Sequence, residues 1–159
     1  MEIATRRVPF AGVAHAPGEA WMLQVARNLT DAVDGFLLEK RYLIVDRDPL
    51  YTKAFRRMLA GAGVEVLRLP ARSPNLNAYA ERFVRSIRED CLHHIVPLGE
   101  RHLRTILTEY LEHYHQERNH RGLGNALIEP RAGPANDNGE VLRKQRLGEL
   151  LSFYQRRAA

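Results

Sequence analysis

The sequence predicts an α/β fold, in which short buried strands alternate with amphipathic helices. Two apolar runs, Tyr42 to Val45 and Val64 to Leu69, have the length and the β-branched content of strands. Apolar residues recur at three- and four-residue steps in several other segments, which is typical of helices. The chain has 159 residues, of which 45% are hydrophobic, and this is ordinary for one globular core with a tail.

The first predicted helix runs from Pro17 to Thr30 and covers the core. Its apolar residues follow a roughly helical spacing: Trp21, Leu23, Val25, Ala26 and Leu29. A large aromatic side chain at helical spacing usually packs inside a protein. We therefore expect Trp21 to belong to the core and not to stack on a nucleic-acid base.

A second helix is predicted between the two strands. The step Asp48-Pro49 turns the chain after the first strand, and helical spacing then runs from Tyr51 to Ala62. The second strand, Val64 to Leu69, leads into a segment from Pro70 to Asn75 that is rich in Pro, Ser and Asn. Such a composition favours a loop, which we expect to lie over the functional site.

The next helix has an apolar face and a polar face. The apolar face is expected to lie against the sheet and consists of Ala80, Val84, Ile87 and Cys91. A second stripe carries an amide, a carboxylate and two guanidiniums, from Asn77, Glu81, Arg85 and Arg88. A carboxylate beside guanidiniums suits a site that holds metal and grips phosphates, whereas an ordinary surface pair of Glu81 with Arg85 is the structural alternative.

The last predicted helix runs from about Glu100 to Arg118 and closes the core. Its apolar stripe is formed by Leu103, Ile106, Leu107, Tyr110, Leu111 and Tyr114. Arg118, His120 and Arg121 follow at its end, where cations complement the helix dipole. These three side chains either cap the helix or contact phosphates, and the sequence leaves both readings open.

Beyond Pro130 the composition changes. Residues 131–140 are a predicted linker, because they are rich in Gly, Pro and Asn and lack large apolar side chains. Residues 141–159 form a basic amphipathic tail that is expected to dock on the core or on DNA. The predicted organisation is thus a partial core at 1–130, the linker and the tail.

The charge balance indicates a polyanionic partner. The net charge is +5, and clustered Arg and Lys side chains gain affinity by releasing counterions from phosphates. Cys91 is the only cysteine, so an internal disulfide is excluded. The sequence has neither a long apolar run nor a signal-peptide pattern, and we expect a cytoplasmic, DNA-associated protein without a membrane partner.

Asp46 and Glu81 are the candidate functional carboxylates. Asp46 ends the first strand in Ile44-Val45-Asp46-Arg47-Asp48, and Glu81 lies on the helix that follows Ser73-Pro74-Asn75-Leu76-Asn77. Magnesium in proteins is usually held by one or two carboxylates together with substrate phosphates and water. Such a pair therefore suits phosphodiester chemistry.

At these residues the chain from Arg41 to about Leu123 resembles the second half of the integrase-type (rve-type) catalytic core of DDE transposases and retroviral-type integrases. The shared pattern is an Asp at a strand end, a Ser-Pro-x-x-Asn segment, a helix with a Glu, and a second helix that ends in Tyr-x-x-x-Arg-x-His. The last part reads Tyr114-His115-Gln116-Glu117-Arg118-Asn119-His120 here. His115 stands where the family often has Asn.

This resemblance implies a ribonuclease H-like mixed sheet flanked by helices and metal-dependent cleavage and transfer of DNA strands. Asp46 and Glu81 would be the catalytic and metal-binding residues, with Mg²⁺ or Mn²⁺ as cofactor. Asp48 is the alternative to Asp46, because it lies two residues further along. The DNA-binding residues would be Asn77, Arg85, Arg88, Arg118 and His120.

The resemblance also implies that the core is incomplete. The first catalytic Asp of the family lies on the first, central strand of the sheet, and this sequence has no Asp before Asp31. Glu2 to Val8 and Phe10 to Ala14 are expected to form the end of strand two and strand three. We therefore expect an N-terminally truncated fragment that is inactive alone and that pairs with the missing N-terminal part or forms a homo-oligomer. The alternative is a non-catalytic remnant of a mobile element that binds DNA or partner subunits.

Overall fold

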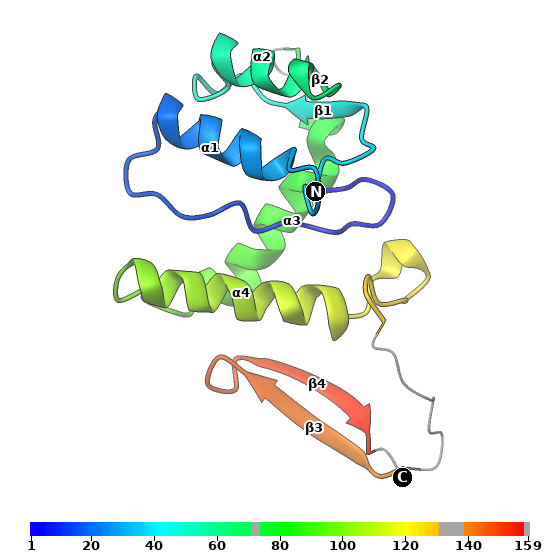
Figure 1. Ribbon diagram of the computed structural model, residues 1–159. Coiled ribbons are helices and arrows are strands. Elements are labelled where there is room, and N and C mark those ends of the chain that lie inside the picture. Colours follow the sequence, from blue (N-terminus) through cyan, green and yellow to red (C-terminus); the bar gives the residue numbers. More distant parts are fainter. Residues whose placement is uncertain (71–73, 131–138, 158–159) are drawn as a thin grey trace. The chain divides into compact units, whose positions relative to one another are not determined.

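A computed structural model describes residues 1–70, 74–130 and 139–157 as a mixed α/β protein with small sheets (Figure 1). Contacts between Cα atoms divide the chain into two compact units. Residues 11–78 form the first, here called the α/β unit. Residues 1–10 together with 79–159 form the second, here called the hairpin unit.

The α/β unit contains two helices and a parallel pair of strands. In chain order its elements are α1 (Glu19–Leu29), β1 (Tyr42–Val45), α2 (Lys53–Gly61), β2 (Glu65–Arg68) and the 3₁₀ helix η1 (Pro74–Asn77). The register of β1 and β2 pairs Tyr42 with Glu65 and Val45 with Arg68. The predicted helices and strands of this part are confirmed, with boundaries that differ by one or two residues.

The core of the α/β unit forms where α2 packs against α1. The hydroxyl of Thr52 accepts a hydrogen bond from the Phe55 N–H at 3.2 Å and so caps the start of α2. Phe55 and Leu59 then project from one face of α2 and are completely buried beside residues of α1. Trp21 packs against this cluster, as predicted.

The strands of this unit contribute one face to the core. Leu43 and Val66, which are paired across β1 and β2, pack against the buried cluster. On the opposite face, Leu67 is exposed and Ile44 is half-buried. In the part of the chain that the structure describes, β1 pairs with β2 alone.

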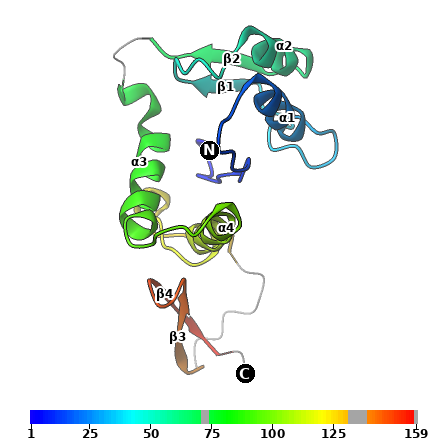
Figure 2. The same cartoon turned by 90° about the vertical axis from the view of Figure 1, so that its left-hand side faces the viewer.

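The hairpin unit consists of two helical segments and an antiparallel hairpin. Helix α3 (Ala78–Ile87) continues into the π-helix η2 (Arg88–Leu92), and α4 (Glu100–Gln116) is followed by the 3₁₀ helix η3 (Arg121–Leu123). Strands β3 (Val141–Arg146) and β4 (Leu151–Arg156) form the hairpin, which lies next to α4 (Figure 2). The predicted stripe of α4 is confirmed at its centre, because Ile106, Tyr110 and Tyr114 are buried.

Of the four positions in the predicted apolar face of α3, two are buried, Ala80 is half-buried, and one is wrong. Ile87 and Cys91 are buried, but Val84 is 41% exposed. Phe83 takes its place and lies with its ring 5.1 Å from the ring of Tyr114 on α4. The larger ring removes more apolar area from water, so the helix turns Phe83 and not Val84 towards the core. The core that this face meets lies on α4 and the hairpin, and not on the predicted sheet.

The predicted hairpin at the N-terminus is wrong. Residues 1–14 contain a turn and extended chain but no strand. Arg6 has a positive φ of 67°, and its N–H donates to the carbonyl of Glu2 at 2.9 Å. The N–H of Val8 donates to Nε2 of His115 on α4 at 3.0 Å. Backbone groups that a strand partner would satisfy are therefore satisfied by a local turn and by a helix side chain.

The amphipathic tail forms the β3–β4 hairpin and docks on the core of its own unit. Leu151 is buried with Ile106 and Tyr110 of α4, and Leu147 and Leu150 pack around them. Of the two expected docking partners, the core is therefore confirmed. Most of the predicted linker, residues 131–138, lies outside the described residues, and the proposed boundaries at 130 and 140 remain a prediction.

Candidate functional site

Asp46 is the first residue after β1, at the carboxyl end of the parallel strand pair. Its side chain is exposed, and Oδ1 accepts the N–H of Asp48 at 3.0 Å. Beside it, Nε of Arg47 donates to the carbonyl of Leu69 at 3.1 Å, which ties this loop to the end of β2. Asp46 is thus an exposed carboxylate on a loop that both strands hold in place.

Asp48, the alternative to Asp46, has a similar local role. Its Oδ1 accepts the N–H of Leu50 at 2.8 Å, so two successive side-chain turns carry the chain from β1 towards α2. The pKa of the neighbouring Tyr51 hydroxyl is raised, mainly because the hydroxyl is buried and further because of the charges of Asp46 and Asp48. The end of β1 therefore carries two exposed carboxylates with Arg47 between them.

Glu81 lies on the exposed side of α3, opposite the face that is buried. Phe83 and Ile87 point into the core, and Glu81 and Arg85 are exposed, as the helical spacing requires. Among the ion pairs of the described residues, none joins Glu81 to Arg85. The surface-pair alternative for these two side chains therefore has no support in the structure.

The other members of the polar stripe extend from both ends of α3. Asn77 ends η1 just before the helix and is half-buried. Arg88 is exposed and begins the π-turn, in which the N–H of His93 donates to the Arg88 carbonyl at 3.0 Å. Ser73, which begins the motif before Asn77, lies outside the described residues.

Arg118 has partners inside the hairpin unit. Its guanidinium contacts Oδ2 of Asp90 at 2.5 Å and lies 5.8 Å from the centre of the Tyr114 ring. The hydroxyl of Tyr110 donates to the same Asp90 oxygen at 3.2 Å, and burial together with the Asp90 charge raises the pKa of that hydroxyl. Arg118 therefore has a structural role, but this role is an ion pair with Asp90 and not the predicted helix cap. Its contact with DNA remains a prediction.

His115 near the end of α4 and His120 beyond it also have partners inside the hairpin unit. Nε2 of His120 is 2.7 Å from the carbonyl of Tyr114, and the His120 ring lies edge-on to the Tyr114 ring at 4.7 Å. Nε2 of His115 accepts the N–H of Val8, so the residue that departs from the family pattern holds the N-terminal segment. Burial lowers the pKa of both imidazoles, which favours their neutral form.

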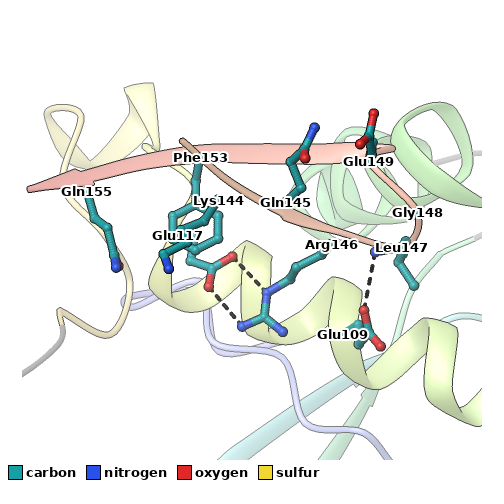
Figure 3. Close-up of a pocket in the computed structure, with 10 residues that line it drawn as sticks. All are labelled: Glu109, Glu117, Lys144, Gln145, Arg146, Leu147, Gly148, Glu149, Phe153 and Gln155. Carbon is teal, nitrogen blue, oxygen red and sulfur yellow. Dashed lines mark hydrogen bonds and ion pairs between the residues drawn. The ribbon is translucent and has the colours of Figure 1, made fainter. Parts of the chain in front are cut away.

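Sequence reasoning missed a polar cluster between α4 and the hairpin (Figure 3). Glu117 follows α4, and its side chain is only 1% exposed. Arg146 of β3 donates to both Glu117 oxygens, from Nε at 2.9 Å and from a terminal nitrogen at 2.8 Å, and also pairs with Glu112 at 2.7 Å. Glu117 and Arg146 border an open depression of about 740 Å³ that neither Asp46 nor Glu81 lines.

The electrostatics of this cluster follow from burial and pairing. Burial by itself raises the pKa of Glu117, but the hydrogen bonds from Arg146 and His113 outweigh it and lower the pKa below its usual value. Burial lowers the pKa of His113, against the opposing effect of Glu117. His113 is therefore neutral near pH 7, and its Nδ1–H donates to Glu117 at 3.2 Å. The only sequence sign of this cluster was an acidic residue four positions after a histidine.

The predicted site residues fall in both units. Asp46 and Asn77 belong to the α/β unit, whereas Glu81, Arg85, Arg88, Arg118 and His120 belong to the hairpin unit. Within the described ranges, no three His, Cys, Asp or Glu side chains gather closely enough to hold a metal ion. The carboxylate oxygens of Asp46 and Glu81 are the kind of hard ligands that Mg²⁺ and Mn²⁺ take. A shared ion between them remains a prediction.

Comparison with known proteins identifies the middle of the chain. Residues 62–127 match the family model described as Integrase core domain. The matched segment begins before β2 and includes α3, α4 and η3, and so contains Glu81 but not Asp46. No curated protein matches the chain, and no solved structure does. In the described residues, no helix is long and apolar enough to cross a membrane.

Glu117→Gln is expected to lower the free energy of unfolding by about 2 kcal/mol, because it removes a charged acceptor from Arg146 in a buried position. Chemical denaturation followed by circular dichroism measures this change. Glu100→Gln is the matched control, since it breaks only the exposed Arg104–Glu100 pair on α4 and is expected to cost a few tenths of a kcal/mol. Equal stabilities of the two variants would contradict the anchoring role of Glu117.

The free energy of unfolding is expected to fall as the pH is lowered from about 6.5. Burial lowers the pKa of His113, His115 and His120 from 6.5, so the unfolded chain binds more protons than the folded one in this range. The lowered pKa of Glu117 adds a further loss as the pH falls below its ordinary value of 4.5. Denaturation curves recorded across this range measure the slope.

His115→Asn tests the histidine contribution to that slope. The amide keeps an oxygen that can accept the Val8 N–H but does not titrate, so the loss of stability with acid should become shallower. His93→Asn, at an exposed position on the same unit, controls for the replacement itself. A slope identical to that of the parent chain would show that His115 does not contribute.

Proposed function

We propose that this chain acts on DNA as part of a DDE-type transposase or integrase, because residues 62–127 match the family model described as Integrase core domain. Its reaction would be metal-dependent cleavage and joining of DNA strands. The observation that carries the proposal is Glu81, exposed on a helix inside the matched segment and opposite its buried face.

In the proposed site, Asp46 and Glu81 are the metal ligands. Asp46 follows a strand, and its Oδ1 is already held by the Asp48 N–H, which leaves Oδ2 for a cation. Glu81 extends from α3 into solvent on the same stripe as Arg85. Magnesium or manganese bound there would polarise a phosphoryl oxygen of the DNA backbone.

We propose a ribonuclease H-like arrangement for the complete core. The parallel pair of β1 and β2, with α1 and α2 packed together beside it, is compatible with part of such a sheet. The site residues outside the metal pair would bind DNA: Asn77, Arg85, Arg88, Arg118 and His120. Of these, Arg85 and Arg88 are the most exposed, and guanidiniums form bidentate bonds to phosphates.

We further propose that this chain does not cleave DNA alone. The family uses a third carboxylate, from an Asp on a strand before the one that leads to Asp46, and this sequence has no Asp before Asp31. Because each metal interaction is worth several kcal/mol in the transition state, loss of that ligand would lower the rate by roughly a thousand-fold or more. The second candidate is a protein that binds DNA or partner subunits without cleavage, and the net charge of +5 suits the DNA binding that both candidates require.

Mn²⁺ binding tests the proposed metal pair without relying on activity. Asp46→Asn and Glu81→Gln are each expected to weaken Mn²⁺ binding by about ten-fold or more, because each removes a ligand. If both carboxylates hold one ion, the double variant should lose less than the sum of the two single losses. Free Mn²⁺ measured by electron paramagnetic resonance during a titration gives all four affinities.

Glu89→Gln is the matched control for this cycle, since Glu89 is exposed on η2 just beyond α3. It should leave the Mn²⁺ affinity unchanged. Additive losses in the double variant, or losses equal to that of Glu89→Gln, would show that Asp46 and Glu81 do not share an ion.

The purified chain is expected to show no Mg²⁺-dependent nicking of supercoiled plasmid DNA, because one carboxylate of the family's site is absent. Agarose gel electrophoresis separates nicked from supercoiled plasmid and measures this directly. Nicking that disappears in Asp46→Asn would disprove the proposed inactivity of the chain while supporting Asp46 as a catalytic residue.

A further inference from the structure

The β3–β4 hairpin has two different faces. On the face towards α4, Arg146 pairs with Glu117, and the Phe153 ring lies 6.3 Å from the His113 ring. Figure 3 shows Lys144, Arg146 and Phe153 on this side, and Gln145 pointing the other way. Because side chains alternate along a strand, the residues that share a side with Gln145 form a separate outer face.

The outer face is basic and carries one aromatic ring. The antiparallel register pairs Val141 with Arg156, Arg143 with Tyr154, and Gln145 with Ser152, so these six side chains share it. None of the six is acidic. The arrangement therefore places a tyrosine directly opposite one arginine and two residues away from another on the same strand.

Tyr154 is not needed to dock the hairpin. It is 70% exposed, whereas its two neighbours in the chain, Phe153 and Gln155, are half-buried. Docking is carried by Leu151 in the core and by the pairing of Arg146 with Glu117 and Glu112. A large aromatic side chain that remains exposed beside a well-anchored face is available for a ligand.

The arginines beside Tyr154 are held by the hairpin. A terminal nitrogen of Arg143 donates to Oγ of Ser152 at 2.9 Å, and one of Arg156 donates to the carbonyl of Gly139 at 3.0 Å. A guanidinium has five N–H donors, so each side chain keeps donors for another partner. These bonds fix two positive charges on either side of the exposed ring.

We propose that this outer face binds single-stranded DNA, with Tyr154 stacking on an unpaired base and Arg143 and Arg156 contacting the flanking phosphates. An exposed aromatic ring between cations on a strand pair is the combination that single strands require, because a base in a duplex keeps both its faces stacked. The choice of DNA over RNA rests on the proposed function. The six residues of the face do not include Asp46 or Glu81.

Binding of a fluorescein-labelled single-stranded oligodeoxynucleotide to the full chain, measured by fluorescence anisotropy in the presence of EDTA, tests this proposal. Without free metal ions, the measurement is independent of the proposed metal pair. Tyr154→Ala should weaken binding by roughly ten-fold, whereas Tyr154→Phe should bind like the parent chain because it keeps the ring. Tyr154→Thr, which suits a strand, should weaken binding to the same extent and thereby exclude an effect of folding.

The arginines are tested by the salt dependence of the same binding. Arg143→Gln and Arg156→Gln should each lower the slope of log affinity against log salt by about one, while the Tyr154 variants leave the slope unchanged. Arg101→Gln is the matched control, because Arg101 is exposed at the start of α4 and lies outside the face. It should change neither the affinity nor the slope appreciably.

Three results would overturn the proposal. The first is equal single-strand affinity of Tyr154→Ala and the parent chain, including no binding by either. The second is tighter binding to a duplex of the same sequence. The third is Tyr154-dependent binding to vesicles of phosphatidylserine and phosphatidylcholine in place of DNA. Because the Mn²⁺ cycle concerns other residues, each of these results would leave the proposed metal pair standing.

Discussion

The hairpin unit depends on the hydrogen bonds that the buried carboxylate of Glu117 accepts. It lies at the end of α4, where it accepts hydrogen bonds from Arg146 of the hairpin and from His113 one turn earlier. A carboxylate is stable in such a position only when its oxygens are paired, because an unpaired buried charge is expensive. The pairing therefore holds the hairpin against the end of α4. It also determines which face of the hairpin remains exposed to solvent.

Some side chains of α4 pack in the core, and another binds the N-terminal segment. Ile106, Tyr110 and Tyr114 fill the core, while His115 holds the N-terminal segment through the Val8 N–H. Arg118, just beyond the helix, completes a contact with Asp90 and Tyr110. The end of the Tyr-x-x-x-Arg-x-His segment thus has a structural role in this chain, whatever it contributes to DNA. Arg85 and Arg88 on the other helical segment are exposed and are better placed for phosphates.

The two proposed catalytic carboxylates belong to different units. Asp46 is held by the strand pair of the α/β unit, and Glu81 by a helix of the hairpin unit, and each unit has its own buried cluster. Each carboxylate is positioned locally by short-range forces: a side-chain turn for Asp46, and the burial of Phe83 and Ile87 on the far side of α3 for Glu81.

The elements whose patterns are local could be predicted from the order of the amino acids. The apolar run before Asp46, the helix before Gly63 and the long stripe through Tyr110 and Tyr114 all form as predicted, because strand and helix periodicity is a property of neighbouring residues. The resemblance to an integrase core that the motif spacing indicated agrees with the family model that matches residues 62–127. Tertiary structure alone decided that Phe83 replaces Val84 in the core, that Val8 bonds to His115, and that Glu117 meets Arg146. These contacts join residues far apart in the chain or choose between neighbouring apolar side chains, and local periodicity carries no information about either.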